Sequence, residues 1–490
     1  MIVSAHLPVI QVIIPLIAAP VCSLLPKSRI AWIFTSLISV ATFLVSIAIT
    51  LQVNTIGLLS YNMGNWPAPW GISYYIDHLS ALLLILISAI ACITLISSRA
   101  LLEQEIPAHK RSLFYTAFLL CMTGLLGIVA TGDAFNVFVF LEISSLSAYA
   151  LIAMGRDRKA LMAAYQYLIM GTIGATFILI GIGLLYMQTG TLNMLDLHQR
   201  ISTIASFRSV HAAFAFFTVG IFLKLALFPL HQWLPNAYTY APSAVSIFLA
   251  ATATKVALYL LYRVFYTLFG FEFSFEVLHL SSILMPLSII AVIVSSLVAI
   301  FQTDVKRMLA YSSLGQIAYM TLGISLQTQA GLIASIIHLF NHAFIKGALF
   351  MCLACLASSI KTTQCQGLAG VGRSHPWVCA AFVLGGLALI GIPPTSGFIS
   401  KWYLVSAIFE SSSWWLAIIV MFTSLLAVVY VWRVVEQMYF REPTSELVSL
   451  HATPRLLLAA TWLMIFLTVY FGIDNRYPVS MASAAVESLL

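Results

Sequence analysis

The sequence predicts an all-α integral membrane protein of about fourteen transmembrane helices, with two inverted five-helix repeats that each contain a proline-broken helix. The composition is the first observation: 61% of the 490 residues are hydrophobic and 8% are charged, whereas a soluble domain carries about 25% charged residues. The second is a series of apolar runs of about 20 residues, the length that crosses a bilayer. The third is a pair of proline-interrupted runs that lie five spans apart.

The apolar runs divide the chain into its expected spans. We expect them at residues 4–25, 29–52, 76–98, 112–130, 134–154, 162–187, 209–235, 243–266, 280–301, 306–325, 329–358, 377–407, 413–435 and 455–474. The first run has no basic n-region and no cleavage site, so we expect a span and not a signal peptide. The connections between the runs are too short to hold a soluble domain.

The positive charges alternate between the two sides of these spans. Four of the 23 Lys and Arg residues lie inside spans, and four lie on the side of the loops after even-numbered spans, in those loops or at the adjoining span ends: Arg200, Arg208, Arg263 and Arg476. The loops after odd-numbered spans, with the adjoining span ends, hold the other fifteen: Lys27, Arg29, Arg99, Lys110, Arg111, Arg156, Arg158, Lys159, Lys306, Arg307, Lys361, Arg373, Arg433, Arg441 and Arg455. Because Lys and Arg are enriched in cytoplasmic loops, both chain ends are expected on the non-cytoplasmic side.

Two expected spans are interrupted in a similar way. Span 7 breaks at Pro229, which His231 follows, and span 12 breaks in GIPPTSGFISKW at Pro393, Pro394 and Gly397. A unit of five spans has odd parity, so a second copy begins at the opposite face, as in many secondary transporters. The predicted division is therefore residues 1–111 (spans 1–3), 112–266 (first repeat, spans 4–8), 280–440 (second repeat, spans 9–13) and 441–490 (span 14 and tail).

A lysine and a glutamate are expected to interact beside the first break. Lys224 lies deep in its apolar run, and Glu142 is the only one of the sixteen acids well inside a span. An ionisable group at this depth costs roughly 2.5–3.5 kcal/mol on insertion scales and usually faces protein or water. Burial favours a neutral lysine and a nearby carboxylate favours a charged one, so movement of the pair could switch Lys224 between releasing and holding a proton. The alternatives are a static ion pair that fixes helix packing, or a lysine that snorkels to the membrane surface.

Further titratable side chains lie at membrane depth in the rest of the chain. Lys255 is in the middle of span 8, and Lys401 follows the break of span 12. His338, His342 and Lys346 share one face of span 11, where eight residues at ~1.5 Å each cover about 12 Å. A single histidine there would be read as a packing residue, but three titratable groups on one stripe favour reversible proton transfer.

Other residues have less specific readings. His231 lies at the first break and is either a relay member or a residue of the broken backbone. Asp304 is expected to cap span 10. Cys352 and Cys355 form a CxxC within an apolar run and are read as buried hydrophobes and not as a metal or redox site. The sequence contains no GxGxxG, Walker A or clustered Cys/His pattern, so no cofactor, metal site or nucleic-acid partner is expected.

Together the buried groups predict a charged axis through the centre of the membrane. Its expected members are Glu142, Lys224, Lys255, His338, His342, Lys346 and Lys401. Such an axis can conduct protons with the help of water, and it offers little to a bulky organic substrate. A cation-binding cage would need several oxygen ligands, and a single buried carboxylate supplies few of them.

Five segments of the chain resemble a known family: TGDAFNVFVFLEISSLSAYALIA, LKLALFPLHQWLPNAY, DVKRMLAYSSLGQIAY, HLFNHAFIKGALF and GIPPTSGFISKW. They are similar to the proton-translocating, antiporter-like subunits of respiratory complex I and of Mrp-type multisubunit cation/proton antiporters, and most similar to the D-type branch of the latter. The resemblance implies fourteen helices, Glu142 paired with Lys224, and Lys401 as the terminal charged residue. It also implies membership of a larger assembly in a bacterial inner membrane, with any NADH or quinone chemistry in other subunits.

Three functions follow as hypotheses. The first is a subunit that translocates protons, coupled by its complex to Na⁺ or another monovalent cation. The second is the same proton path in a complex I-type or membrane hydrogenase arm, driven by redox chemistry. The third, from a different class, is a structural membrane subunit whose buried charges only specify packing. A catalytic redox role is disfavoured because cofactor ligands are missing from the sequence.

Overall fold

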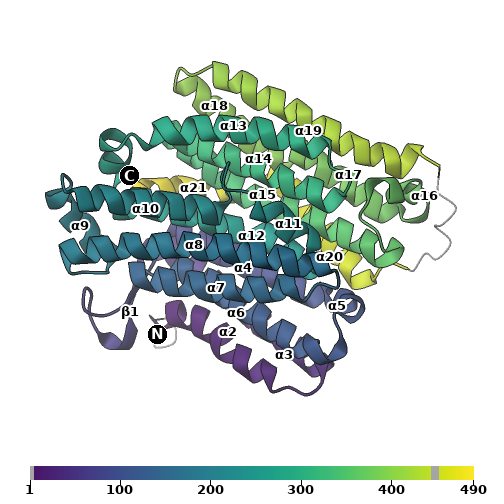
Figure 1. Ribbon diagram of the computed structural model, residues 1–490, viewed down its shortest axis with the longest axis horizontal. Coiled ribbons are helices and arrows are strands. Elements are labelled where there is room, and N and C mark those ends of the chain that lie inside the picture. The colour runs from purple at the N-terminus through teal and green to yellow at the C-terminus, as the bar shows by residue number, and fades with distance from the viewer. Residues whose placement is uncertain (1–4, 443–451) are drawn as a thin grey trace.

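The computed structural model of the chain describes residues 5–442 and 452–490, and nearly all of its regular structure is helical (Figure 1). Most helices run side by side along the long axis of the molecule. The elements up to the first break are α2 (Leu7–Ser23), α3 (Ser28–Ile56), β1 (Leu59–Asn62), η1 (Met63–Asn65), β2 (Ser73–Ile76), α4 (His78–Ser97), α5 (Arg99–Glu105), η2 (Ala108–Lys110), α6 (Arg111–Ala130), α7 (Ala134–Ala153), α8 (Arg158–Thr189), α9 (Met194–Ile204) and α10 (Arg208–Leu225).

The elements after the first break complete the bundle. They are α11 (Trp233–Tyr240), α12 (Ser243–Tyr262), the π-helical segments η3 (Arg263–Leu268) and η4 (Glu272–Val277), α13 (Leu280–Ile300), α14 (Val305–Ser325), α15 (Gln329–Ile360), η5 (Cys365–Leu368), α16 (Val371–Ser374), α17 (Pro376–Ile390), α18 (Ser396–Glu410), α19 (Trp415–Phe440), α20 (Arg455–Ile473) and α21 (Arg476–Leu489). The strands β1 and β2 pair antiparallel in a short hairpin.

The predicted all-α membrane fold is confirmed. Among the described residues, eleven helices are long and apolar enough to cross a membrane, and α2 and α17 are shorter apolar helices. With α14, and with α10–α11 and α17–α18 each taken as one interrupted crossing, they match the fourteen expected spans. The expected start of the first span at residue 4 lies outside the described residues.

Two faces of the bundle can be told apart by the connections they carry (Figure 1). The first, which we call the terminal face, carries both ends of the chain, the β1–β2 hairpin and α9. The second, the basic face, carries α5, α16 and the end of α19. Lys27, Arg156 and Lys361 lie in connections of the basic face, all of which follow odd-numbered spans.

The hydropathy pattern missed one long element, the C-terminal helix α21. Its buried residues recur every three or four positions: Pro478, Met481, Ala482, Ala485, Val486 and Leu489. This is the pattern of an amphipathic helix that packs on one side only. Its polar side lowers the mean hydropathy, so a search for continuous apolar runs does not find it.

Both interrupted helices end with a residue in the left-handed conformation. Ala226 follows α10 with φ +58°, and Gly391 follows α17 with φ +92°. After each, an N–H bonds to a carbonyl five residues back, from Leu227 to Phe222 in the first break, at 3.0 Å. These are Schellman-type ends, which satisfy carbonyls that a helix terminus leaves free. Pro229 and Pro394 each lie three residues after the left-handed residue, so the predicted breaks are present at both places.

Two pairs of loop contacts repeat along the chain. Asp133 caps α7 and bridges to Asn193, and Asp304 caps α14 and bridges to Gln364. The same number of residues separates Asp133 from Asp304 and Asn193 from Gln364. The first contact lies at the terminal face and the second at the basic face. The prediction that Asp304 caps its helix is confirmed by its acceptance of the Arg307 N–H at 3.1 Å.

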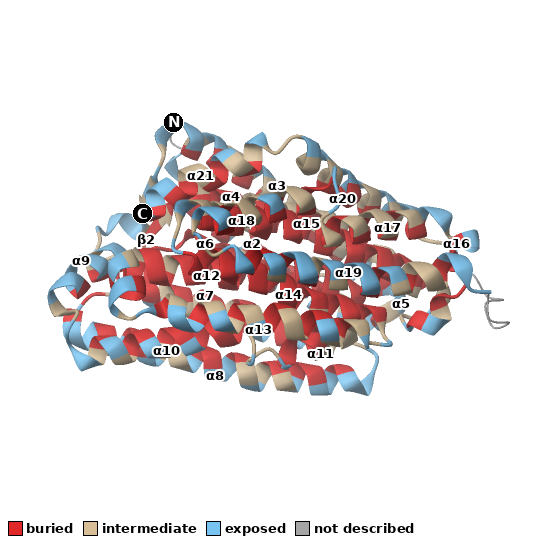
Figure 2. Ribbon diagram, turned by 90° about the horizontal axis from the view of Figure 1, so that it is seen from above, coloured by how far each residue is buried: buried red, intermediate tan, exposed pale blue. Residues whose placement is uncertain are grey.

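The centre of the bundle is formed by α12, α14 and α15 (Figure 2). Every residue of α12 except Ala253 is buried. The flanking helices α8, α13, α19 and α20 expose large apolar side chains such as Leu161, Ile290, Leu425 and Phe466. A helix buried on all sides lies in a core, so charged residues on α12 and α15 are screened from lipid by protein.

Candidate functional site: a buried row of charged side chains

The row begins where α7 meets the end of α10. Lys224 is 7% exposed, and its ammonium group donates to Ser145 Oγ at 2.8 Å. Ser145 lies one turn after Glu142 on α7. Glu142 interacts electrostatically with Lys224, but they form no ion pair in this structure, and the buried Glu142 Oε1 has no hydrogen-bond partner among the described residues. A hydroxyl group therefore binds the lysine that was expected to contact the carboxylate.

A small cavity lies between Lys224 and α12. Its volume is about 30 Å³, and its lining includes Ser144, Ser145 and Lys224 on one side and Val256 and Ala257 on the other. This is room for about one water molecule, which needs two to four polar partners. Two hydroxyls and an ammonium group supply them. The cavity borders the stretch of α12 that carries Lys255, so water there would extend the polar path toward that residue.

Lys255 is the central group of the row. It is 1% exposed, and its ammonium group donates to the Ala250 carbonyl at 2.6 Å, toward the basic end of α12. It interacts electrostatically with His342 and Lys346 on α15. Lys346, which is fully buried, donates to the Leu309 carbonyl at 2.8 Å and to Ser312 Oγ. No carboxylate pairs with these lysines among the described residues, so the charged form of each is held by hydroxyls and carbonyls alone.

The two histidines of α15 differ in their contacts. The rings of His338 and His342 are parallel, with centroids 5.9 Å apart. His338 bonds through Nδ1 to Ser400 Oγ at 2.7 Å and through Nε2 to Gln316 Oε1 at 3.0 Å. Because the amide oxygen only accepts, Nε2 carries the proton in this arrangement. Both ring nitrogens of the fully buried His342 lack a partner among the described residues, so His342 is the less constrained of the two.

The row ends at Lys401, beside the second break. Its ammonium group donates to the carbonyls of Leu389 and Ile390, at 3.3 and 2.8 Å, and to Ser424 Oγ at 2.9 Å. The last carbonyls of a helix lack intrahelical partners and carry partial negative charge. The break of α17 thus creates the acceptors that hold this lysine at membrane depth.

Tyr319 connects this end of the row to His338. Its ring lies edge-on to His338 with centroids 6.0 Å apart, and Lys401 Nζ is 5.0 Å from the ring centre. Its hydroxyl group bonds to Thr423 Oγ1 at 2.7 Å. The structure therefore brings both Lys401 and His338 into contact with one aromatic ring.

The residues predicted at the breaks have different surroundings. His231 is half-buried, stacks on Phe228 with centroids 5.2 Å apart, and has no partner for Nδ1 among the described residues. It lies outside the row of contacts described above. A Cβ atom on Gly397 would lie 1.8 Å from the Ala388 carbonyl oxygen, so the second break requires glycine there. Pro393 and Pro394 form the turn between α17 and α18.

Several polar side chains of the row were missed in the sequence. They are Ser145, Ser312, Gln316, Tyr319, Ser400 and Ser424, each of which contacts a predicted residue. One signal was available: Ser312, Gln316 and Tyr319 follow one another at spacings of four and three, so they share a face of α14. The serines on α7, α18 and α19 carry no comparable signal, because serine is common in transmembrane helices.

The two cysteines of the CxxC motif are free and buried within α15. Cys355 Sγ lies 3.6 Å from Thr461 Oγ1. In the described part of the chain, no group of three or more His, Cys, Asp or Glu side chains could hold a metal ion.

A multi-pass helical bundle with a row of charged side chains in its core is the architecture of a membrane ion-transport protein. The chain belongs to the family described as "NADH:quinone oxidoreductase/Mrp antiporter, TM", which matches residues 131–427. That range contains every residue of the row. The resemblance read from the sequence motifs is thereby confirmed.

The relatives fall into two groups. The chain is 40% identical over 443 residues to NADH-quinone oxidoreductase subunit N of Desulforudis audaxviator, covering 89% of this chain and 87% of that protein. It is 28% identical over 422 residues to the D subunit of the Na(+)/H(+) antiporter of Alkalihalophilus pseudofirmus, covering 86% and 84%. The match to the corresponding antiporter protein of Bacillus subtilis is 27% over 484 residues, covering 98% and 97%.

Solved structures show the same fold. A chain of the archaeal membrane-bound sulfane sulfur reductase superposes with a TM-score of 0.90 at 29% identity, covering 99% of this chain and 98% of that one. A chain of the Mrp complex from Dietzia sp. DQ12-45-1b also gives a TM-score of 0.90, at 23% identity and with coverage of 100% and 98%. These structural neighbours are subunits of multisubunit membrane assemblies.

Proposed function

We propose that this chain is the proton-translocating membrane subunit of a multisubunit monovalent cation/proton antiporter, with Na⁺ as the exchanged cation. The observation that carries the proposal is the row from Glu142 through Lys224 and Lys255 to His342 and Lys401. Five helices contribute these groups, and none of the groups is exposed. A row of buried bases without bound counterions suits the passage of protons better than the binding of a metal cation, which needs several oxygen ligands.

The contacts support a relay in which each lysine has a neutral hydrogen-bond partner, both when the lysine is charged and after it has lost its proton. Lys224 bonds to Ser145, Lys255 to a carbonyl, and Lys401 to carbonyls and Ser424. Lysine can lose its proton in such surroundings, whereas arginine stays charged. Approach of Glu142 to Lys224 would favour the charged lysine, and separation would favour proton release toward the cavity and Lys255.

The second candidate is the same proton path in a redox-driven complex. The 40% identity to a protein named NADH-quinone oxidoreductase subunit N, and the likeness to a chain of a sulfane sulfur reductase, favour this reading. The antiporter reading is favoured by the matches to two proteins named as Na(+)/H(+) antiporter subunits. A structural subunit without its own path remains the alternative from a different class.

Isolation of the intact complex tests the proposal. A tagged chain would be purified from native membranes, its partner subunits identified, and the complex placed in vesicles with a pre-formed pH gradient. Addition of Na⁺ should dissipate the gradient, and the partners should be membrane subunits without redox centres. Flux that needs an electron donor, with iron–sulfur partners, would replace the antiporter reading by the redox one. Absence of flux under both conditions would leave the structural alternative.

We also propose that helices α6–α12 and α13–α19 are the two inverted repeats, within residues 112–266 and 280–440, with 1–111 and 441–490 outside them. The matching breaks after α10 and α17 support this division, as do the equal 32-residue lengths of α8 and α15. The repeated Asp133–Asn193 and Asp304–Gln364 contacts at opposite faces support the inversion. The repeat would give each half one broken helix with a lysine beside it.

The orientation is the final part of the proposal: a bacterial inner membrane with the terminal face outside the cytoplasm. The fifteen-to-four charge distribution supports it, and a reporter active only outside the cytoplasm should be active when fused after Leu490. The seven native cysteines are buried, which permits a matched labelling pair. An impermeant thiol reagent added outside should label Gln199→Cys on α9 and spare Gln104→Cys on α5. The reverse pattern would invert the orientation.

A further inference from the structure

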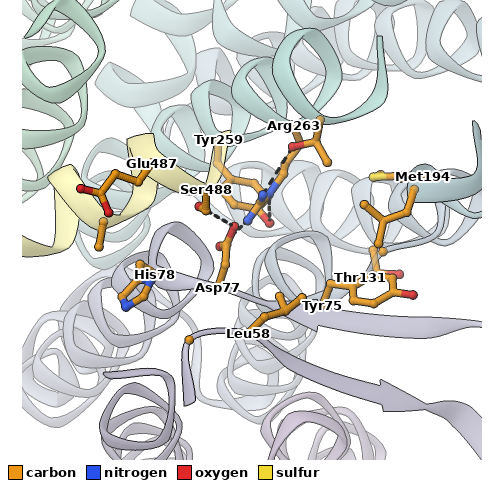
Figure 3. Close-up of a pocket in the computed structure, with 15 residues that line it drawn as sticks. Leu58, Tyr75, Asp77, His78, Thr131, Met194, Tyr259, Arg263, Glu487 and Ser488 are labelled. Atoms are coloured by element: carbon orange, nitrogen blue, oxygen red, sulfur yellow. Dashed lines mark hydrogen bonds and ion pairs between the residues drawn. The ribbon is translucent and has the colours of Figure 1, made fainter. Parts of the chain in front are cut away.

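A cavity of about 440 Å³ opens at the terminal face, and Figure 3 shows residues that line it. We call it the vestibule. Its wall includes Thr131 and Met194 from the connections of that face, and Glu487 and Ser488 from α21. It also includes Asp77, Tyr259 and Arg263. Tyr259 and Lys255 lie one helical turn apart on α12, so the vestibule reaches within one turn of the central lysine.

An ion pair lies in the vestibule wall nearest the row. Arg263 Nη2 donates to Asp77 Oδ1 at 2.5 Å, and their side chains are 12% and 10% exposed. The other ion pairs in the described residues have at least one side chain that is 35% exposed or more. A buried ion pair gives little net stability because both charges lose water, but loss of one partner is strongly unfavourable. The pair therefore adds little to the stability of the fold, but it holds its helices in the one arrangement in which both charges are paired.

Hydrogen bonds connect this pair to three helices. Arg263 Nε donates to the Tyr259 hydroxyl at 2.8 Å, and Arg263 Nη2 donates to Ser80 Oγ at 3.0 Å. Tyr259 in turn donates to the Val129 carbonyl of α6 at 2.8 Å. Ser488 of α21 donates to Asp77 Oδ2 at 3.5 Å. The cluster thus joins α4, α6 and α12 between the vestibule and the row, and α21 contacts it from outside.

Lys255 points away from this cluster. Its ammonium group binds the Ala250 carbonyl, toward the basic face, whereas Tyr259 and Arg263 follow it toward the terminal face. The π-helical segment η3 begins at Arg263, and such departures from α-helical geometry are frequent at functional sites. In this structure the Lys255 ammonium group therefore points toward the basic face, and the Asp77–Arg263 cluster lies between Lys255 and the vestibule.

A contact at the other end of the bundle shows that an arginine can join two helices of this chain without a carboxylate. Arg433 on α19 donates to the carbonyls of Ile300 and Gln302 at the end of α13. No ion pair to Arg433 is present in the described residues. If Arg263 served only to hold α12 against its neighbours, backbone carbonyls would suffice, and Asp77 would be needed only as the cap of α4.

We propose that the vestibule is the outer mouth of the proton path and that the Asp77–Arg263 pair, with Tyr259, is its gate. The inference rests on the proposed function and adds the exit side to it. With the pair closed, vestibule water stops at Tyr259. Opening of the pair lets water pass Tyr259, and Lys255 can then turn toward the terminal face and release its proton to that water. Ser488 of α21 donates to Asp77, so movement of α21 would change how readily the Asp77–Arg263 pair opens.

Thiol accessibility in the intact complex tests the gate without requiring transport. Val256→Cys places a thiol in the cavity beside Lys224, and Ala484→Cys places one in the vestibule; Cys121→Ala removes the native thiol of the inner cavity. With Ag⁺ added from the terminal face, Ala484→Cys should react in every background, and Val256→Cys should be protected while the pair is intact. Arg263→Gln should raise the rate at Val256→Cys by about tenfold or more, within the usual range of coupling between sites.

Two further variants separate the gate from a loss of folding. Asp77→Asn should also expose Val256→Cys, and asparagine can still cap α4, as Asp77 does through the Ser80 N–H. Arg263→Lys keeps the charge and should keep the protection. Equal labelling of Val256→Cys in all backgrounds would overturn the proposal. If the unmodified complex carries no proton flux, the proposed function fails, and the labelling still decides whether the pair is a gate.

Discussion

Proton transport by the intact complex should fall to background when Lys224 is replaced by arginine, even though the positive charge is kept. Lys224 is buried at the end of α10, bonded to Ser145 and close to Glu142. A lysine in this place can release a proton, whereas an arginine side chain is not deprotonated in proteins. Lys224→Ala should abolish transport in the same way. The measurement is the rate at which Na⁺ dissipates a pH gradient in vesicles that hold matched amounts of assembled complex.

The arginine variant separates a relay from a static ion pair. If Lys224 only fixes helix packing through Glu142, Lys224→Arg should keep most of the transport and Lys224→Ala should lose assembly. Lys110→Arg is the matched control, because Lys110 is exposed at the basic face and the same substitution there should change nothing. Glu142→Gln should also abolish transport, since it removes the charge that favours protonated Lys224. Near-normal flux in Lys224→Arg would remove Lys224 from the proton path.

Much of the architecture could be predicted because a bilayer constrains the sequence strongly. Each crossing must satisfy its own backbone groups and be apolar for about 20 residues, so the fourteen apolar runs correspond to fourteen crossings in the described part of the chain. The two breaks were visible because proline cannot continue a helix. Lys224, Lys255, Lys346 and Lys401 stood out because charged residues are rare at that depth, and the structure shows all four of them buried.

The partners of these residues could not be predicted in the same way. Ser145 and Ser424 are common residue types in apolar helices, and their role depends on which helices are neighbours in space. Asp77 and Arg263 are far apart in the sequence, at the ends of two spans, and both resembled ordinary surface charges. The bond between them exists because α4 and α12 pack together in the core. A lysine's depth can be read from one helix, whereas its contacts require the whole bundle.

Lys255 is the point at which the two halves of the row meet, and its loss should also reduce transport to background. Lys224 approaches α12 from one side through the water-sized cavity, and His342 and Lys346 approach from the other. Methionine has a similar length and is tolerated in buried apolar surroundings, so Lys255→Met should fold and assemble. It cannot hold a proton, and α12 carries no other lysine, histidine or acid. The row would be divided into two unconnected parts.

The most direct test is therefore proton flux through vesicles that contain the purified complex with Lys255→Met. Thr254→Val, at the neighbouring residue that bonds weakly to the same ammonium group at 3.5 Å, is the control for local polarity and should transport normally. We expect the Lys255→Met complex to be fully assembled and to show only the background leak of empty vesicles. Flux equal to that of the unmodified complex, at equal protein content, would contradict the claim that protons cross this chain through its buried charged row.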